Sequence, residues 1–106
     1  MITEETIHKA IHILAQASPA QKIILLGSYA RGNAHPDSDI DLLVIEPSLK
    51  SRHQEMVRLR DLLSPLRIPV DIMVSDEDQF NQWSDQPGSY IYDAAHYGKV
   101  LYEKKS

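Results

Sequence analysis

The stretch Asp39-Ile40-Asp41-Leu42-Leu43-Val44-Ile45 constrains the fold of this chain more than any other segment. Its short length and aliphatic content predict a buried β-strand. Alternate residues of a strand share one face, so the Asp39 and Asp41 carboxylates should lie side by side, with their α-carbons about 6 to 7 Å apart. Ile40, Leu42 and Val44 then point to the opposite face, where burial holds the register.

The remaining segments alternate between helical and strand patterns. Strands are predicted at 22–26, 69–74 and 99–102, and helices from Thr3 to before Pro19, between 48 and 65, and over 89–97. Ser75 is expected to cap a helix whose first turn holds the acidic residues 76–78. Gly98 is expected to close the last helix in a left-handed conformation. This order predicts an α/β or α+β fold with a small sheet flanked by helices.

The connections between the strands predict where a third acid lies. If the turn after 22–26 meets Asp39, the first two strands run antiparallel, so the sheet is mixed. The helical crossover from the second strand favours a parallel third strand, which brings Asp71 level with Asp39 and Asp41. Three carboxylates should therefore meet at one edge of the sheet.

Composition narrows the possible functions. The 106 residues suit one domain, 1–106, and their formal charge of −4 argues against an extensive nucleic-acid surface. The chain has no cysteine, so thiolate metal sites and cysteine nucleophiles are absent. No segment has the pattern of a signal peptide or a membrane span, so we expect a cytoplasmic protein with no membrane partner.

The segment between the first two strands has the residues of a phosphate-binding turn. Gly27 ends a strand and Ser28 opens a short helical turn, whose amides and hydroxyl can face a phosphate. The acids Asp39, Asp41 and Asp71 suit a hard cation, with Mg²⁺ first and Mn²⁺ as the alternative. Such a trio can hold two ions for nucleotidyl transfer, and Asp71 is a candidate for removing the acceptor proton.

These residues resemble a known family. Gly27-Ser28, ten intervening residues and then Asp39-Ile40-Asp41 are similar to the signature of the minimal nucleotidyltransferases (MNT) of the DNA polymerase beta-like superfamily. The stretches 31–32 and 36–44 also resemble the usual sequence of the family, as do the later acidic strand Val70-Asp71-Ile72 and the ending 98–103. The resemblance covers almost the whole chain.

The resemblance implies a function and a partner. Members use Mg²⁺ and a nucleoside triphosphate, and many pair with a HEPN-domain toxin that cleaves RNA. Some act as antitoxins by transferring AMP from ATP to a tyrosine of that toxin. By position, Gly27 and Ser28 would hold the triphosphate, and Asp39, Asp41 and Asp71 the metal. The alternatives are an inert antitoxin that acts by binding alone, or a transferase acting on a small molecule or an RNA end.

Several residues have two interpretations. Arg31 either neutralises nucleotide phosphate or pairs with Asp37 or Asp39 to hold the loop. His8 and His12 share a helix face, but without a third ligand they are poor metal-site candidates. The aromatic residues concentrate in the last quarter of the chain. Most of them are expected in the core, with one or two left to contact a partner.

Overall fold

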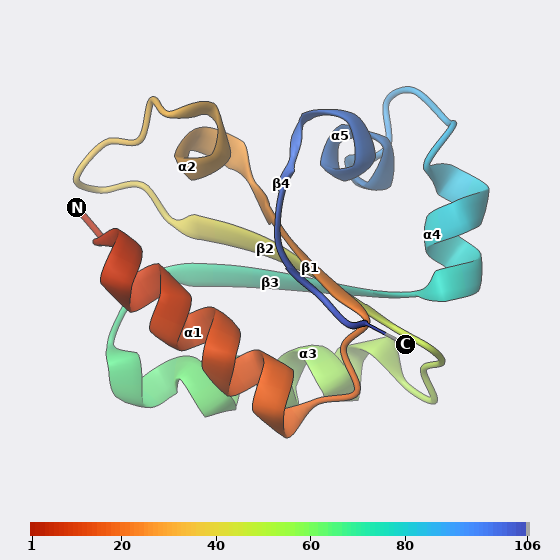
Figure 1. Cartoon of the computed structure of the whole chain (residues 1–106), viewed down its shortest axis with the longest axis horizontal. Coiled ribbons are helices and arrows are strands. Elements are labelled where there is room, and N and C mark those ends of the chain that lie inside the picture. Colours follow the sequence, from red (N-terminus) through yellow and green to blue (C-terminus); the bar gives the residue numbers. More distant parts are fainter. Residues whose placement is uncertain (106) are drawn as a thin grey trace.

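The computed structural model describes residues 1–105, which form a four-stranded mixed sheet with the strand order β3-β2-β1-β4 (Figure 1). The strands are β1 (Lys22–Leu26), β2 (Ile40–Glu46), β3 (Val70–Asp76) and β4 (Lys99–Glu103). β1 is antiparallel to both β2 and β4, whereas β2 and β3 are parallel. The predicted mixed sheet and the direction of its first three strands are confirmed.

Helices cover both faces of this sheet. They are α1 (Glu4–Ala17), α2 (Gly27–Arg31), α3 (Arg52–Leu63), the 3₁₀ turn η1 (Ser64–Leu66), α4 (Glu77–Trp83) and α5 (Tyr90–Tyr97). α1 and α3 lie on one side of the sheet, and α4 and α5 on the other (Figure 1). No helix within residues 1–105 is long and apolar enough to cross a membrane.

The alternation in β2 divides its side chains between two apolar clusters. Ile40, Leu42 and Val44 pack with residues of α1 and α3, whereas Leu43 and Ile45 pack with Ala94 of α5. Asp41 has the same parity as Leu43, so it belongs to the face that α4 and α5 cover. The strand register therefore decides which helices lie near the acids.

Two predicted helix ends are wrong. Ser75 is buried in β3, and the N-cap of α4 is Asp76, whose carboxylate accepts a hydrogen bond from the Gln79 amide at 2.7 Å. Ser75 is fully buried, pairs with Ile45 of β2, and its hydroxyl donates to the Asp76 carbonyl at 2.9 Å. Gly98 does close α5, but with φ −77° rather than a left-handed conformation. A β-carbon at Gly98 would overlap Ile24 of β1, so the glycine serves close packing of α5 on the sheet.

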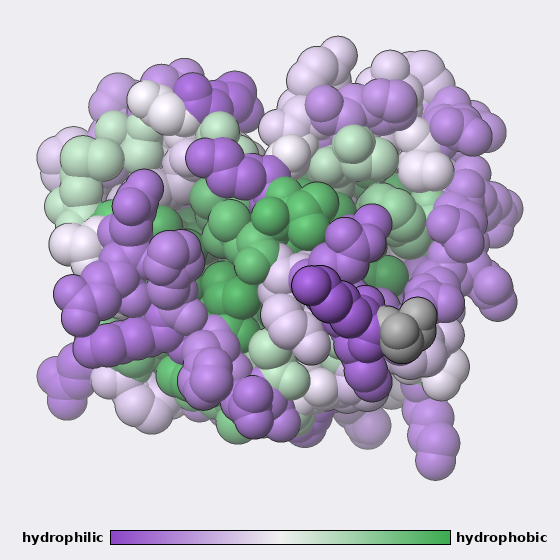
Figure 2. All heavy atoms as spheres, in the orientation of Figure 1, coloured by the Kyte–Doolittle hydropathy of each residue, from purple (hydrophilic) through white to green (hydrophobic). Residues whose placement is uncertain are grey.

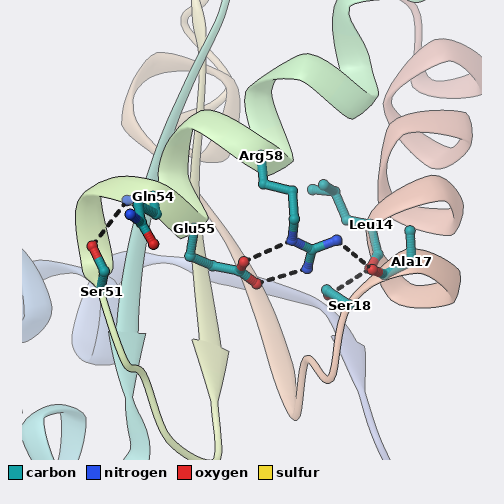
Figure 3. Close-up of polar contacts among 7 residues, drawn as sticks. All are labelled: Leu14, Ala17, Ser18, Ser51, Gln54, Glu55 and Arg58. Carbon is teal, nitrogen blue, oxygen red and sulfur yellow. Dashed lines mark hydrogen bonds and ion pairs between the residues drawn. The ribbon is translucent and has the colours of Figure 1, made fainter.

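The C-terminal end of β2, called the far end below, carries a charged cluster formed by Glu46, Glu55 and Arg58. Arg58 donates from Nε and Nη2 to the two carboxylate oxygens of Glu55, both at 2.8 Å, and from Nη1 to the Ala17 carbonyl at 2.9 Å (Figure 3). Glu46 is 2% exposed, and its Oε2 has no hydrogen-bond partner within residues 1–105. Arg58 thus joins α3 to the end of α1 and supplies the counter-charge of the cluster.

Candidate active site

The sheet register brings the predicted acids to one edge. Asp41 lies opposite Leu26 of β1 on one side and Asp71 of β3 on the other. Asp39 precedes the first residue of β2, and its charge acts on Asp41. Antiparallel pairing places the end of β1 beside the start of β2, and parallel pairing places the start of β3 there as well. Asp39, Asp41 and Asp71 are therefore neighbours although the first and the last are 32 positions apart in the sequence.

Gly27 joins β1 to α2 immediately beside these acids. Its φ is +67°, a conformation that residues with a side chain rarely adopt, and a β-carbon there would overlap the Asp41 carboxylate. Both conditions require glycine. The absence of a side chain lets the first turn of α2 approach Asp41, so the turn and the carboxylate share one space.

Negative charge accumulates at this edge. Partial burial raises the pKa of Asp41, the charges of Asp71 and Asp39 raise it further, and Arg31 opposes the rise. No ion pair within residues 1–105 involves any of the three acids or Arg31. The predicted alternative in which Arg31 pairs with Asp37 or Asp39 is therefore not found. Repulsion among ionised carboxylates is relieved by a bound cation.

The donor set fits a divalent metal ion in its chemistry. Three carboxylates supply hard oxygen ligands of the kind that Mg²⁺ and Mn²⁺ prefer, and none of the three forms an ion pair within residues 1–105. Within the described part of the chain, no three acidic or histidine side chains are already gathered closely enough to hold an ion. Binding of an ion by all three acids would therefore require their side chains to move closer together. His8 and His12 are exposed on α1 and form no such group either.

A cavity of about 460 Å³ adjoins the Gly27 turn. It lies between α2 and α5, where Figure 2 shows a notch in the upper outline of the molecule. Leu26, Gly27 and Arg31 form one wall, and Tyr90, Asp93 and Tyr97 of α5 form the other. The volume lies within the usual range for small-molecule sites.

The α5 wall of the cavity was missed in the sequence. Most late aromatics were expected in the core, but Trp83, Tyr90 and Tyr97 are 42%, 37% and 69% exposed. A signal was present in the spacing, since residues 90, 93 and 97 fall on one helix face while Ile91 and Ala94 are buried on another. Helical periodicity could have grouped these three residues on one face, separate from Ile91 and Ala94. It could not show that the face lies opposite α2.

Comparisons with known proteins identify the family and the fold of the chain. The family model described as nucleotidyltransferase domain matches residues 7–100. A search of curated proteins finds no significant match. Among solved structures, a Sulfolobus solfataricus protein assigned as a nucleotidyltransferase is 19% identical with TM-score 0.68, covering 94% of this chain and 79% of that one.

Two further structural matches are to chains of toxin–antitoxin complexes. One complex contains AMP-PNP, and its matching chain is 24% identical with TM-score 0.64, covering 98% of this chain and 76% of that one. The other contains a tri-AMPylated Shewanella oneidensis HEPN toxin with MNT antitoxin. The matching chain of that complex is 21% identical with TM-score 0.61, and the match covers 97% of this chain and 74% of that one. At these identities the likeness shows a shared fold, and the family match over residues 7–100 establishes that the chain belongs to the nucleotidyltransferase domain family.

Proposed function

We propose that residues 1–106 act as one Mg²⁺-dependent nucleotidyltransferase domain that transfers AMP from ATP to a hydroxyl group of a HEPN-type toxin, with a tyrosine as the expected acceptor. In this role the protein is an antitoxin. The observation that carries the proposal is the meeting of Asp41, Asp71 and the Gly27 turn at one edge of the sheet. Phosphoryl chemistry needs anion-binding amides and cation-binding carboxylates within one small space.

Each site residue has a distinct task in this proposal. The backbone at Gly27 and the Ser28 hydroxyl hold the triphosphate, and Arg31 offsets its charge from the cavity side. Asp39, Asp41 and Asp71 are the residues that would hold Mg²⁺, with two ions expected and Mn²⁺ as the alternative. The metal, when bound, neutralises charge on the phosphates and makes the acceptor hydroxyl more acidic.

The reaction is a displacement at the α-phosphorus of ATP. The acceptor oxygen forms a bond to the α-phosphorus. The bond between the α-phosphorus and the oxygen that bridges it to the β-phosphate breaks, and pyrophosphate leaves with that electron pair. The acceptor proton passes to the Asp71 carboxylate, which is exposed at the β3 side of the site. Asp71→Asn should therefore abolish transfer while some nucleotide binding remains.

The partner assignment is supported by the structural neighbours. Chains of the same fold occur in a complex with a tri-AMPylated HEPN toxin and in a toxin–antitoxin complex with AMP-PNP. The exposed position of Asp71 leaves that side of the site open to an acceptor carried on another protein. An acceptor tyrosine on a partner surface would approach from this side.

Intact-mass spectrometry tests the proposal directly. The protein encoded by the neighbouring gene is incubated with this chain, Mg²⁺ and ATP, beside the Asp39→Asn, Asp41→Asn variant. We expect a mass gain in whole AMP units with the parent only. A stable complex without any mass gain would favour an antitoxin that acts by binding alone. Transfer of labelled AMP to RNA or to small hydroxyl compounds, but not to the partner, would favour a nucleotidyltransferase that acts on a small molecule or an RNA end.

A further inference from the structure

We propose that the cavity between α2 and α5 binds the nucleoside part of the nucleotide, with the ring of Tyr97 as its stacking surface. The inference rests on the proposed function, because it assigns a place to the half of ATP that the phosphate turn and the carboxylates do not contact. It names Tyr90, Asp93 and Tyr97 as nucleoside-binding residues.

The cavity is continuous with the phosphate site. Gly27 belongs to both, since it lines the cavity and its α-carbon faces the Asp41 carboxylate. Arg31 also lines the cavity, and its charge acts on Asp41. A ligand with its phosphates at the Gly27 turn can therefore extend into the cavity without crossing intervening protein.

The α5 wall has the chemistry of a nucleoside site. Tyr97 is 69% exposed, and its ring centroid lies 6.5 Å from that of Tyr92 in an edge-to-face arrangement. Tyr92 thus orients the Tyr97 ring while most of its surface stays open. Bases of any kind stack on such a ring. Asp93, one turn earlier, accepts hydrogen bonds from base amino groups or ribose hydroxyls.

The sheet order separates this cavity from the acceptor side. The cavity lies beyond β1, toward β4, whereas Asp71 lies on β3 at the other side of β2. The nucleoside and the acceptor hydroxyl then reach the carboxylates from opposite directions. Gly98 maintains the cavity wall, because any side chain there would push the end of α5 away from Ile24 and Leu26.

Isothermal titration calorimetry with two ligands distinguishes a nucleoside site from a phosphate site. The chain is titrated with Mg-ATP and with Mg-tripolyphosphate, which has the phosphates but no nucleoside. Tyr97→Ala should weaken Mg-ATP binding about fivefold or more and leave Mg-tripolyphosphate binding unchanged. Tyr97→Phe keeps the ring and should bind both ligands as the parent does. Trp83→Ala removes an exposed aromatic outside the cavity and serves as the matched control.

The outcomes separate this inference from the proposed function. Equal Mg-ATP affinity in the parent, Tyr97→Ala and a second variant, Tyr90→Ala, would overturn the nucleoside site while Asp39→Asn, Asp41→Asn could still abolish binding of both ligands. An equal loss of affinity for both ligands in Tyr97→Ala would also overturn the nucleoside site, because the substitution would then have changed the phosphate site. A parent that binds neither ligand would reject both proposals.

Discussion

The two ends of β2 handle negative charge in opposite ways. At the far end, Glu46 is buried beside Glu55, and Arg58 supplies a counter-charge from within the chain (Figure 3). At the near end, Asp41 lies beside Asp39 and Asp71, and no ion pair within residues 1–105 neutralises them. The seven residues of β2 thus connect a cluster with a counter-charge inside the chain to a cluster whose acids have no ion-pair partner within residues 1–105.

The difference separates a cluster that joins helices from the cluster that the proposed function uses. The Glu55–Arg58 pair is internally satisfied, and Arg58 also binds the Ala17 carbonyl, so this cluster ties helices together. The near-end acids make no such connections and are more exposed. Uncompensated charge that persists beside a cavity is typical of a binding site, because it stabilises nothing in the free protein.

The largest expected effect is on catalysis by the near end. Asp39→Asn with Asp41→Asn should lower AMP transfer by about a thousandfold or more, since charge stabilisation by a held metal contributes several kcal/mol to the transition state. The readout is the initial rate of AMP incorporation into the partner. Glu46→Gln is the control at the other end and should keep the parental rate. Equal losses in the two variants would contradict the functional distinction between the ends.

Gly27→Ala should be the next largest change. The added β-carbon overlaps the Asp41 carboxylate and strains a φ of +67°, so we expect transfer to fall about a hundredfold and the free energy of unfolding to fall by about 1–2 kcal/mol. Gly32→Ala shares the strain, at φ +78°, but its β-carbon meets nothing within 4 Å. It should therefore lose similar stability and keep most activity. If Gly27→Ala and Gly32→Ala lost activity equally, backbone strain rather than overlap with Asp41 would explain the loss.

The far end should make stability depend on pH. Burial raises the pKa of Glu46 to about 8, and the neighbouring Glu55 adds to the rise. The native state then holds a proton that the unfolded chain releases near its ordinary pKa, so stability falls as pH rises from about 5 to 8. We expect a loss of about 1–3 kcal/mol over this window, which Glu46→Gln should remove. Thermal unfolding of both proteins at several pH values provides the measurement.

Glu55 contributes at lower pH with the opposite sign. Its hydrogen bonds from Arg58 lower its pKa to about 2, so its stabilising effect is complete above its ordinary pKa and is lost as pH falls toward 2. It therefore does not obscure the change expected for Glu46 between pH 5 and 8. A parent protein whose stability is flat over that window would contradict the buried, protonated Glu46.

The smallest effect concerns the stability of the near end. Asp41→Asn removes one charge from a group whose pKa is raised by burial and by Asp71 and Asp39, so repulsion in the free protein decreases. The free energy of unfolding at pH 7 without metal should rise by up to about 0.5 kcal/mol. Urea denaturation measures it. A clear destabilisation would mean that Asp41 has a structural task in the free protein.

The sequence alone determined much of the molecule because local patterns carried the information. The alternation of 39–45 placed the acids on the strand face opposite Ile40, Leu42 and Val44. The requirement that the turn after 22–26 meet Asp39 predicted the antiparallel pair, and the crossover rule predicted the parallel pair, as found. Gly27 and Asp71 were identified by their positions at strand ends. These features depend on residues near one another in the chain or on handedness rules that all such chains obey.

Other features were decided only by tertiary structure. The sequence pattern predicts Ser75 as a helix cap, whereas the residue is buried in β3. The pattern also predicts a left-handed cap at Gly98, whereas close packing of α5 against Ile24 is what requires glycine there. The pairing of Arg58 with Glu55 follows helical spacing, whereas the burial of Glu46 against them depends on α3 docking. The cavity between α2 and α5 joins residues about 70 positions apart. No local pattern encodes such a meeting, because it depends on how the helices pack across a shared sheet.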